Sequence, residues 1–131
     1  MQGQTVRTGI MELHLPAVPS AVSIARAQVA GASALGAFDG YVLALLTSEL
    51  VSNAVLHAGM ASTQDIVVKV AGGDSLRVEV LDEGPGFDPG DRRTFGDANG
   101  GLGLRFVDQL AARWGTERED GHHTVWFELD R

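Results

Sequence analysis

Residues 49–58 read ELVSNAVLHA and complete the strongest helical pattern in the chain, which runs from Gly40 to about Ala58. At about 100° per residue, Glu49, Asn53 and His57 lie on one face of this helix, one turn apart. The remaining positions are largely apolar, so these side chains have no clear solvent-facing side. Because an unpaired carboxylate is costly to bury, either the polar groups are satisfied within a core, or they face a ligand or a hard cation such as Mg²⁺.

The segments on either side of this helix predict an α+β domain. We expect two more helices, at 21–31 and 102–113, with Ser20 and Asp39 as the N-caps of the first two helices. Alternating or β-branched stretches predict strands at 10–15, 66–71, 75–81, 114–119 and 122–129. The order predicts a two-layer α/β sandwich, in which a mostly antiparallel sheet carries helices on one face. Residues 1–9 are expected to form a flexible tail, and residues 10–131 a single domain.

Composition excludes several classes of function. The chain has 131 residues, no cysteine and a net charge of -7. The absence of cysteine excludes disulfides, zinc–thiolate sites and a cysteine nucleophile. The acidic balance argues against direct nucleic-acid binding and against docking on an anionic membrane. The first residues lack the apolar region of a signal peptide, so we expect a cytoplasmic location.

Two glycine-containing stretches follow the helix. DEGPGF, at 82–87, comes directly after the alternating strand, where the carboxylate of Asp82 could accept a hydrogen bond from an exocyclic amine. GGLGL, at 100–104, opens the next helix, and free N–H groups at a helix start bind anions. Taken alone, each stretch is equally compatible with an ordinary turn or with a flexible helix entry.

Taken together and in this order, the motifs resemble the GHKL ATP-binding (Bergerat) fold. This fold is shared by gyrase-type ATPases, Hsp90, histidine kinases and mismatch-repair ATPases. The strings ELVSNAVLHA at 49–58, DEGPGF at 82–87 and TVWFEL at 124–129 are most similar to the small anti-sigma factor serine/threonine kinases. The resemblance covers roughly residues 10–130.

The resemblance implies a role for each motif residue. It makes Glu49 the general base for a substrate hydroxyl and Asn53 the ligand of magnesium. It assigns to Asp82 the recognition of the adenine amino group, with Gly84 and Gly86 beneath the adenine. Residues of the glycine box would contact the triphosphate, and these are Gly101, Leu102, Gly103 and Leu104. The implied cofactors are therefore ATP and Mg²⁺.

Other residues near these motifs have less defined roles. Residues 87–100 would form a short lid over the nucleotide. His57 either contacts phosphate or packs in the interior. Arg92, Arg93 and Arg105 either pair with phosphate or lie on the solvated surface.

The function implied by the resemblance is that of an anti-sigma factor which is also a protein serine/threonine kinase. Such a protein binds a sigma factor and phosphorylates a STAS-type anti-anti-sigma partner. Family members often dimerise, so a homodimer belongs to the expected assemblies. The alternative is an ATP-binding regulatory module of the same fold without phosphoryl transfer, although the acid at Glu49 favours the kinase. A detached histidine-kinase domain is less favoured, because no histidine has a phospho-acceptor context.

Overall fold

The computed structural model describes residues 11–31, 38–57, 65–83, 104–119 and 121–131, without the side chains at 56, 57 and 119. The expected tail at 1–9 lies outside this set. The described part contains three α-helices, α1 (Ser20–Ala30), α2 (Gly40–His57) and α3 (Leu104–Leu110). Its strands are β1 (Met11–Pro16), β2 (Asp65–Ala71), β3 (Ser75–Asp82), β4 (Arg113–Glu119) and β5 (His122–Asp130).

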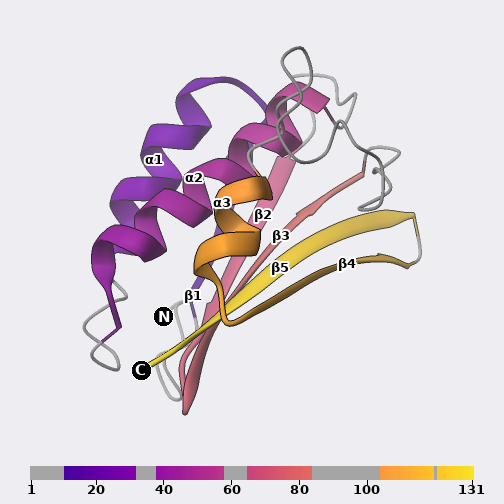
Figure 1. Cartoon of the computed structure of the whole chain (residues 1–131). Helices are drawn as coiled ribbons and strands as arrows, with labels where there is room; N and C mark the ends of the chain where they lie inside the picture. Colours follow the sequence, from indigo (N-terminus) through magenta and orange to yellow (C-terminus); the bar gives the residue numbers. More distant parts are fainter. Residues whose placement is uncertain (1–10, 32–37, 58–64, 84–103, 120) are drawn as a thin grey trace.

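The strands form one sheet in the order β1-β2-β3-β5-β4, and all four pairings are antiparallel. The helices lie together on one face of this sheet (Figure 1). The expected two-layer α+β sandwich is therefore confirmed. No helix in the described ranges is long and apolar enough to span a membrane.

The core lies between the sheet and the helices. Inward-facing strand residues alternate with partly exposed ones, and in β2 the buried positions are Ile66, Val68 and Val70. Helix α2 packs against β3 and β5 and contributes to the core a buried stripe that includes Leu43, Leu46 and Leu50. Val42 and Leu45 of the same helix are only partly buried, because the buried stripe is centred on the other apolar positions of α2.

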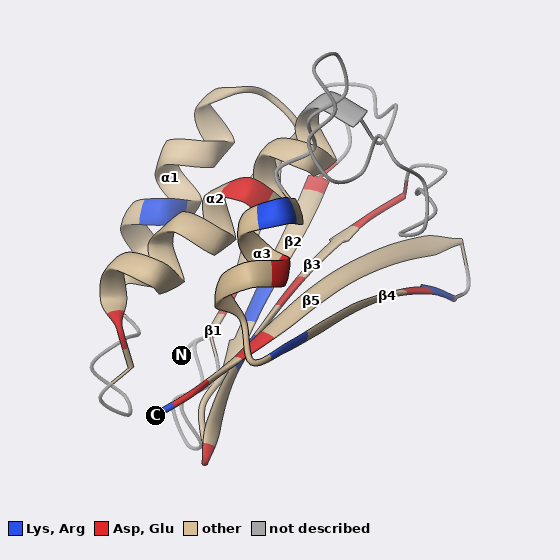
Figure 2. Ribbon diagram, viewed as in Figure 1, with Lys and Arg blue, Asp and Glu red and all other residues tan. Residues whose placement is uncertain are grey.

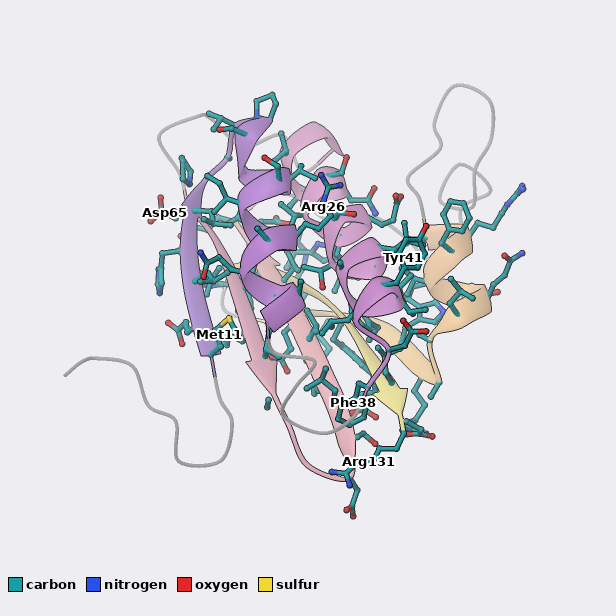
Figure 3. The ribbon with its side chains drawn as sticks, turned by 90° about the vertical axis from the view of Figure 1, so that its left-hand side faces the viewer. Met11, Arg26, Phe38, Tyr41, Asp65 and Arg131 are labelled. Atoms are coloured by element: carbon teal, nitrogen blue, oxygen red, sulfur yellow. The ribbon has the colours of Figure 1, made fainter. Side chains whose placement is uncertain are left out.

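The two helix starts differ in how they are capped. Asp39 caps α2 as expected, since its Oδ1 accepts hydrogen bonds from the N–H groups of Tyr41 and Val42 at 2.9 and 3.1 Å. The expectation for Ser20 is wrong, because Ser20 is the first residue of α1 and Pro19 takes the cap position without a side-chain hydrogen bond. The guanidinium of Arg131 lies over the ring of Phe38, next to the α2 cap, with its Cζ 5.5 Å from the ring centre. The two side chains are labelled close together in Figure 3.

Helix α3 ends earlier than its sequence predicts. Its expected start at residue 102 lies outside the described residues, and it ends at Leu110 rather than at residue 113. The chain turns away because the N–H of Ala112 donates to the carbonyl of Glu128, and Arg113 then begins β4. The following hairpin turns at Gly121, whose φ of 79° is a conformation that glycine adopts without strain.

The outer face of the sheet carries an ion-pair network. Arg77 pairs with Glu79 and Glu128 at 2.8 and 3.0 Å, and Arg113 pairs with Glu128 at 2.6 Å and with Asp130. We call Arg77, Glu79, Arg113, Glu128 and Asp130 the outer network. Arg77 also stacks on the indole of Trp126, 4.1 Å from its centroid.

Candidate functional site

Glu49 and Asn53 lie one turn apart on α2, as their spacing predicts. Glu49 is the only Asp, Glu, Lys or Arg residue of this helix, and α2 carries one acidic patch in the charge-coloured ribbon (Figure 2). The carboxylate is partly buried, and this burial raises its pKa above the ordinary value of glutamate. A raised pKa makes a carboxylate a stronger base, which suits a group that must accept a proton.

Asn53 is 5% exposed, and its Nδ2 has no hydrogen-bond partner within the described part of the chain. A buried amide nitrogen without a partner carries the cost of its lost hydration, and native proteins contain few such groups. The amino end of this amide is therefore unsatisfied within the described part of the chain.

Asp82 is the last residue of β3 and is 5% exposed. Its side chain belongs to the inner face of the sheet, together with Val78 and Val80. Helix α2 packs against β3 and β5, and the C-terminal ends of α2 and β3 point to the same end of the molecule (Figure 1). The sheet and the helix thus place Glu49, Asn53 and Asp82 on one side of the sheet.

A further residue of this region was missed by the sequence analysis. His123 on β5 is directly opposite Asp82 in the strand register, and both side chains are almost fully buried. Nδ1 of His123 is 3.8 Å from Oδ2 of Asp82. The inward alternation of positions 123, 125, 127 and 129 could have identified His123 as an inner residue. Its opposition to Asp82 required the register of β3 and β5, which the sequence did not supply.

The remaining predicted residues are described only in part. Leu104 begins α3 with its side chain buried in the core, which leaves its backbone N–H as the group that could face a ligand. Arg105 lies exposed on α3. The other predicted positions lie outside the described residues or lack a described side chain, and they are Gly84, Gly86, Gly101, Leu102, Gly103, Arg92, Arg93 and His57. Their roles stay predictions.

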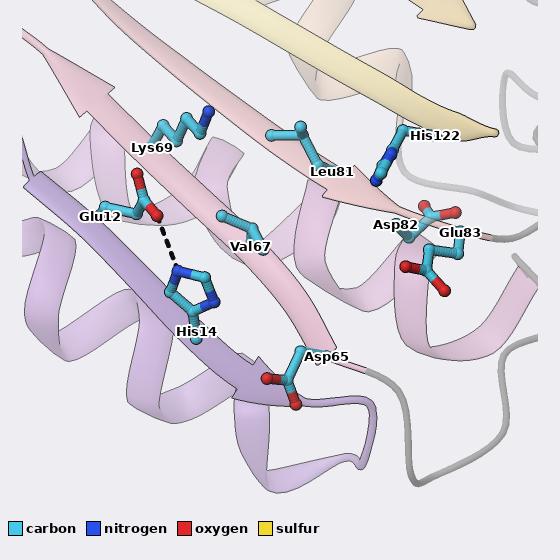
Figure 4. A pocket seen from close by; sticks show the side chains of 9 residues that line it. All are labelled: Glu12, His14, Asp65, Val67, Lys69, Leu81, Asp82, Glu83 and His122. Carbon is cyan, nitrogen blue, oxygen red and sulfur yellow. Dashed lines mark hydrogen bonds and ion pairs between the residues drawn. The ribbon is translucent and has the colours of Figure 1, made fainter. Parts of the chain in front are cut away.

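A separate cavity of about 240 Å³ lies on the outer face of the sheet (Figure 4). Its walls carry Glu12, His14, Asp65, Lys69, Glu83 and His122, above a floor formed by Val67 and Leu81, and Asp82 also contributes to its lining. Glu12 and His14 pair with each other at 2.7 Å. The described residues contain no group of His, Asp and Glu side chains arranged to hold a metal ion. This cavity faces away from α2 and is distinct from the region of Glu49 and Asn53.

The fold and the inner-face residues define a class, namely an α/β sandwich with buried polar groups between one helix and the sheet. Residues 39–131 match the family described as histidine kinase-, DNA gyrase B- and HSP90-like ATPase. The chain belongs to this family of ATP-binding ATPase domains, as its sequence motifs predict. A search of curated proteins finds no match.

Solved structures show the same fold. One is the crystal structure of the RsbU and RsbW domains of Rv1364c from Mycobacterium tuberculosis, with a TM-score of 0.66 and 22% identity over 92% of this chain. Another is the histidine kinase domain of a blue-light activated histidine kinase from Erythrobacter litoralis, with a TM-score of 0.53 and 24% identity over 70% of this chain. The chain spans 31% and 44% of the lengths of these two proteins.

The inner-face residues fit an adenine nucleotide and a magnesium ion. Nδ2 of Asn53 has no partner among the described residues, and the oxygen of the same amide is a ligand of the kind that a hard cation accepts. Mg²⁺ keeps several waters and takes substrate phosphates as ligands beside a small number of protein oxygens, so Asn53 would supply one oxygen of such a site. The buried carboxylate of Asp82 can accept a hydrogen bond from an amino group, which is the feature that distinguishes adenine from guanine at its six-position.

Proposed function

We propose that this chain is an ATP-dependent protein serine/threonine kinase that acts as an anti-sigma factor. It would bind a sigma factor and phosphorylate a serine of a STAS-type anti-anti-sigma protein. Membership of the ATPase family supports the nucleotide. The resemblance of residues 49–58, 82–87 and 124–129 to anti-sigma factor kinases supports the choice of partners.

The observation that carries the proposal is the pair on α2. Asn53 holds a buried amide whose Nδ2 has no partner among the described residues, and Glu49 lies one turn before it with a raised pKa. A module that only bound ATP would need the amide but would have little use for a proton acceptor beside it. The combination of both groups favours phosphoryl transfer over binding alone.

The proposed reaction assigns one task to each residue. Asn53 would bind Mg²⁺, which neutralises phosphate charge during the transfer. The serine oxygen forms a bond to the γ-phosphorus, and the bond from this phosphorus to the β–γ bridging oxygen breaks, so that ADP leaves. The serine proton passes to the carboxylate of Glu49. Asp82 holds the adenine and fixes the direction from which the triphosphate enters.

The proposed switch follows from the charge that the reaction adds. A phosphoserine carries about two negative charges at neutral pH. On the surface of the anti-anti-sigma partner, these charges would be repelled by a chain whose net charge is already -7. Phosphorylation would thereby release the partner and leave the kinase free to bind its sigma factor.

The test is a phosphotransfer assay with the purified chain, Mg-ATP and a panel of STAS-domain proteins. Mass spectrometry would identify phosphoserine. We expect transfer by the wild type and by Thr47→Val, which removes another buried polar group of the same helix. Glu49→Gln and Asn53→Ala should reduce transfer by about 100-fold or more, since general-base and metal contributions are each of this order.

Two results would contradict the kinase. ATP binding without transfer to any member of the panel would indicate the alternative, a regulatory module that binds ATP without catalysis. The absence of ATP binding would refute the nucleotide site itself and leave Glu49 and Asn53 as polar residues of the interior.

A further inference from the structure

His123 and Asp82 form a buried pair on the two central strands at the end of the inner face. Their Cα atoms are direct partners in the antiparallel register of β3 and β5. The side chain of each is 4% exposed, and Nδ1 of His123 lies 3.8 Å from Oδ2 of Asp82. Because directly opposed residues in a sheet project to the same face, the backbone fixes the proximity of these two groups.

The imidazole of His123 acts electrostatically on the carboxylate of Asp82. A buried carboxylate needs nearby positive or hydrogen-donating groups to offset its lost hydration. A distance of 3.8 Å is longer than a hydrogen bond, yet short enough for the dipole or charge of an imidazole to orient the carboxylate. A movement of less than about 1 Å would turn this contact into a hydrogen bond.

We propose that His123 is a positioning residue, whose Nδ1 edge orients the carboxylate of Asp82 so that it can accept a hydrogen bond from the six-amino group of adenine. The inference rests on the proposed nucleotide site and adds the residue on which its base selectivity depends. His123 acts through Asp82 and not by contact with the triphosphate. Its removal should therefore affect recognition of the amino group and spare the rest of the nucleotide.

The structure suggests which substitutions distinguish this role. Asparagine at 123 places an amide nitrogen close to the position of Nδ1, whereas the amide of glutamine reaches the position of Nε2. Leucine has a similar volume and no donor. His122 supplies the matched control, because it is the neighbouring residue with the same side chain and lies exposed on the opposite face.

The experiment measures the binding of two nucleotides by calorimetry in the presence of Mg²⁺. One is ATP, and the other is purine riboside triphosphate, which lacks the six-amino group. We expect His123→Leu and His123→Gln to weaken ATP binding about tenfold, as befits a hydrogen bond to a charged group. Binding of purine riboside triphosphate should change less than about twofold. His123→Asn should retain most of the ATP affinity, and His122→Leu should match the wild type for both nucleotides.

The outcomes separate the inference from the proposed function. If the wild type binds ATP and the His123 variants weaken both nucleotides equally, His123 only supports the fold and the inference is wrong. Unchanged ATP binding by His123→Leu and His123→Gln would also overturn it. If the wild type binds neither nucleotide, the nucleotide site fails, and the inference fails with it. Should His123→Leu not fold, the comparison of the asparagine and glutamine variants decides the question.

Discussion

The two ends of strands β3 and β5 carry polar clusters of opposite character. At one end, on the outer face, the outer network pairs each arginine with at least two carboxylates at the surface. At the other end, on the inner face, Asp82 and His123 are almost fully buried. Nδ2 of Asn53, on the helix that covers this face, has no partner among the described residues.

The two clusters differ in how far water surrounds them. Exposed ion pairs contribute little to stability individually, because water and salt screen them. A buried polar atom without a partner costs free energy in every molecule that folds. The buried Nδ2 of Asn53, which has no partner among the described residues, is therefore the feature that we explain by function, whereas the outer network is explained by the sheet alone.

Asn53→Ala should have the largest effect on function. We expect the affinity for ATP in the presence of Mg²⁺ to fall by about 10- to 100-fold, the usual loss when a metal site is impaired. In EDTA the wild type and the variant should bind ATP with similar affinity, because the metal no longer contributes. Calorimetry with and without EDTA measures both values. An equal loss in EDTA would contradict the role of Asn53 in metal binding.

Asp82→Asn should follow closely, with ATP affinity reduced about 10-fold or more, since the amide replaces a charged acceptor. Asp74→Asn is the matched control, because it makes the same change in the exposed turn just before β3 begins. The control should bind ATP as the wild type does. Loss of affinity in both variants would indicate a general effect of charge and not base recognition.

Thr47→Val sharpens the comparison within α2. The hydroxyl of Thr47 is fully buried and has no partner among the described residues. Valine has the same shape without the polar atom, so we expect the free energy of unfolding to rise by about 0.5–1 kcal/mol. Urea denaturation measures this change. Nucleotide binding should stay the same, and a clear loss of stability would show that the hydroxyl is satisfied after all.

Arg113→Gln should break the outer network with a smaller effect. Arg113 lowers the pKa of Glu128 and of Asp130, chiefly by hydrogen bonding. Because these two carboxyl groups have a lower pKa in the folded state, they stabilise the fold at pH values above their unfolded-state pKa. This stabilisation is lost as the pH falls through their folded-state pKa. We expect a melting temperature about 1–2 °C lower at neutral pH, with the difference shrinking below about pH 4 and in high salt.

The salt dependence of the stability of Arg113→Gln provides the control for this prediction. A destabilisation that persists in molar salt would indicate packing by the arginine stem and not ion pairing. ATP binding should be unchanged throughout, because the outer network lies on the opposite face from Asn53.

Glu49→Gln should have the smallest effect on stability, with the opposite sign. Burial raises the pKa of Glu49, so ionisation of this group destabilises the folded chain at neutral pH. We expect the free energy of unfolding of the glutamine variant to be higher by about a few tenths of a kcal/mol at pH 7. The gain is small because solvent screens the charge of a partly exposed carboxylate. The gain should vanish as the pH falls to about 4. Thermal melts across this range test the sign, even though the same variant loses phosphotransfer.

Much of the fold could be predicted from local patterns in the sequence. Strand alternation identified the strands with shifts of at most one residue, and Asp39 was recognised as the cap of α2. The end of α3 was not predicted, because it depends on a hydrogen bond from the N–H of Ala112 to the carbonyl of Glu128, a residue distant in sequence. Helical periodicity continued to residue 113, and only this tertiary hydrogen bond shows where the helix stops.

The candidate site could likewise be predicted only where local sequence pattern determines the contact. Glu49 and Asn53 could be paired from sequence, because helical spacing brings them together. His123 could not be paired with Asp82, because that required the register between strands separated by some forty residues, about which local pattern is silent. The surroundings of Trp126 also depend on the register, because it lies on the outer face of β5, where Arg77 stacks on it and a side chain at Gly115 would approach its ring to 3.0 Å.

The strand order also bears on the sequence of events in folding. The hairpins β2–β3 and β4–β5 join neighbouring segments, whereas Leu15 on β1 meets its partner Ile66 only after both α1 and α2 have been traversed. Closing a longer loop costs more chain entropy, so contacts of this kind form late unless other packing precedes them. We expect β1 to join the sheet after the hairpins have formed. The N-terminal strand would then seal a core that α2 and the central strands have already begun to assemble.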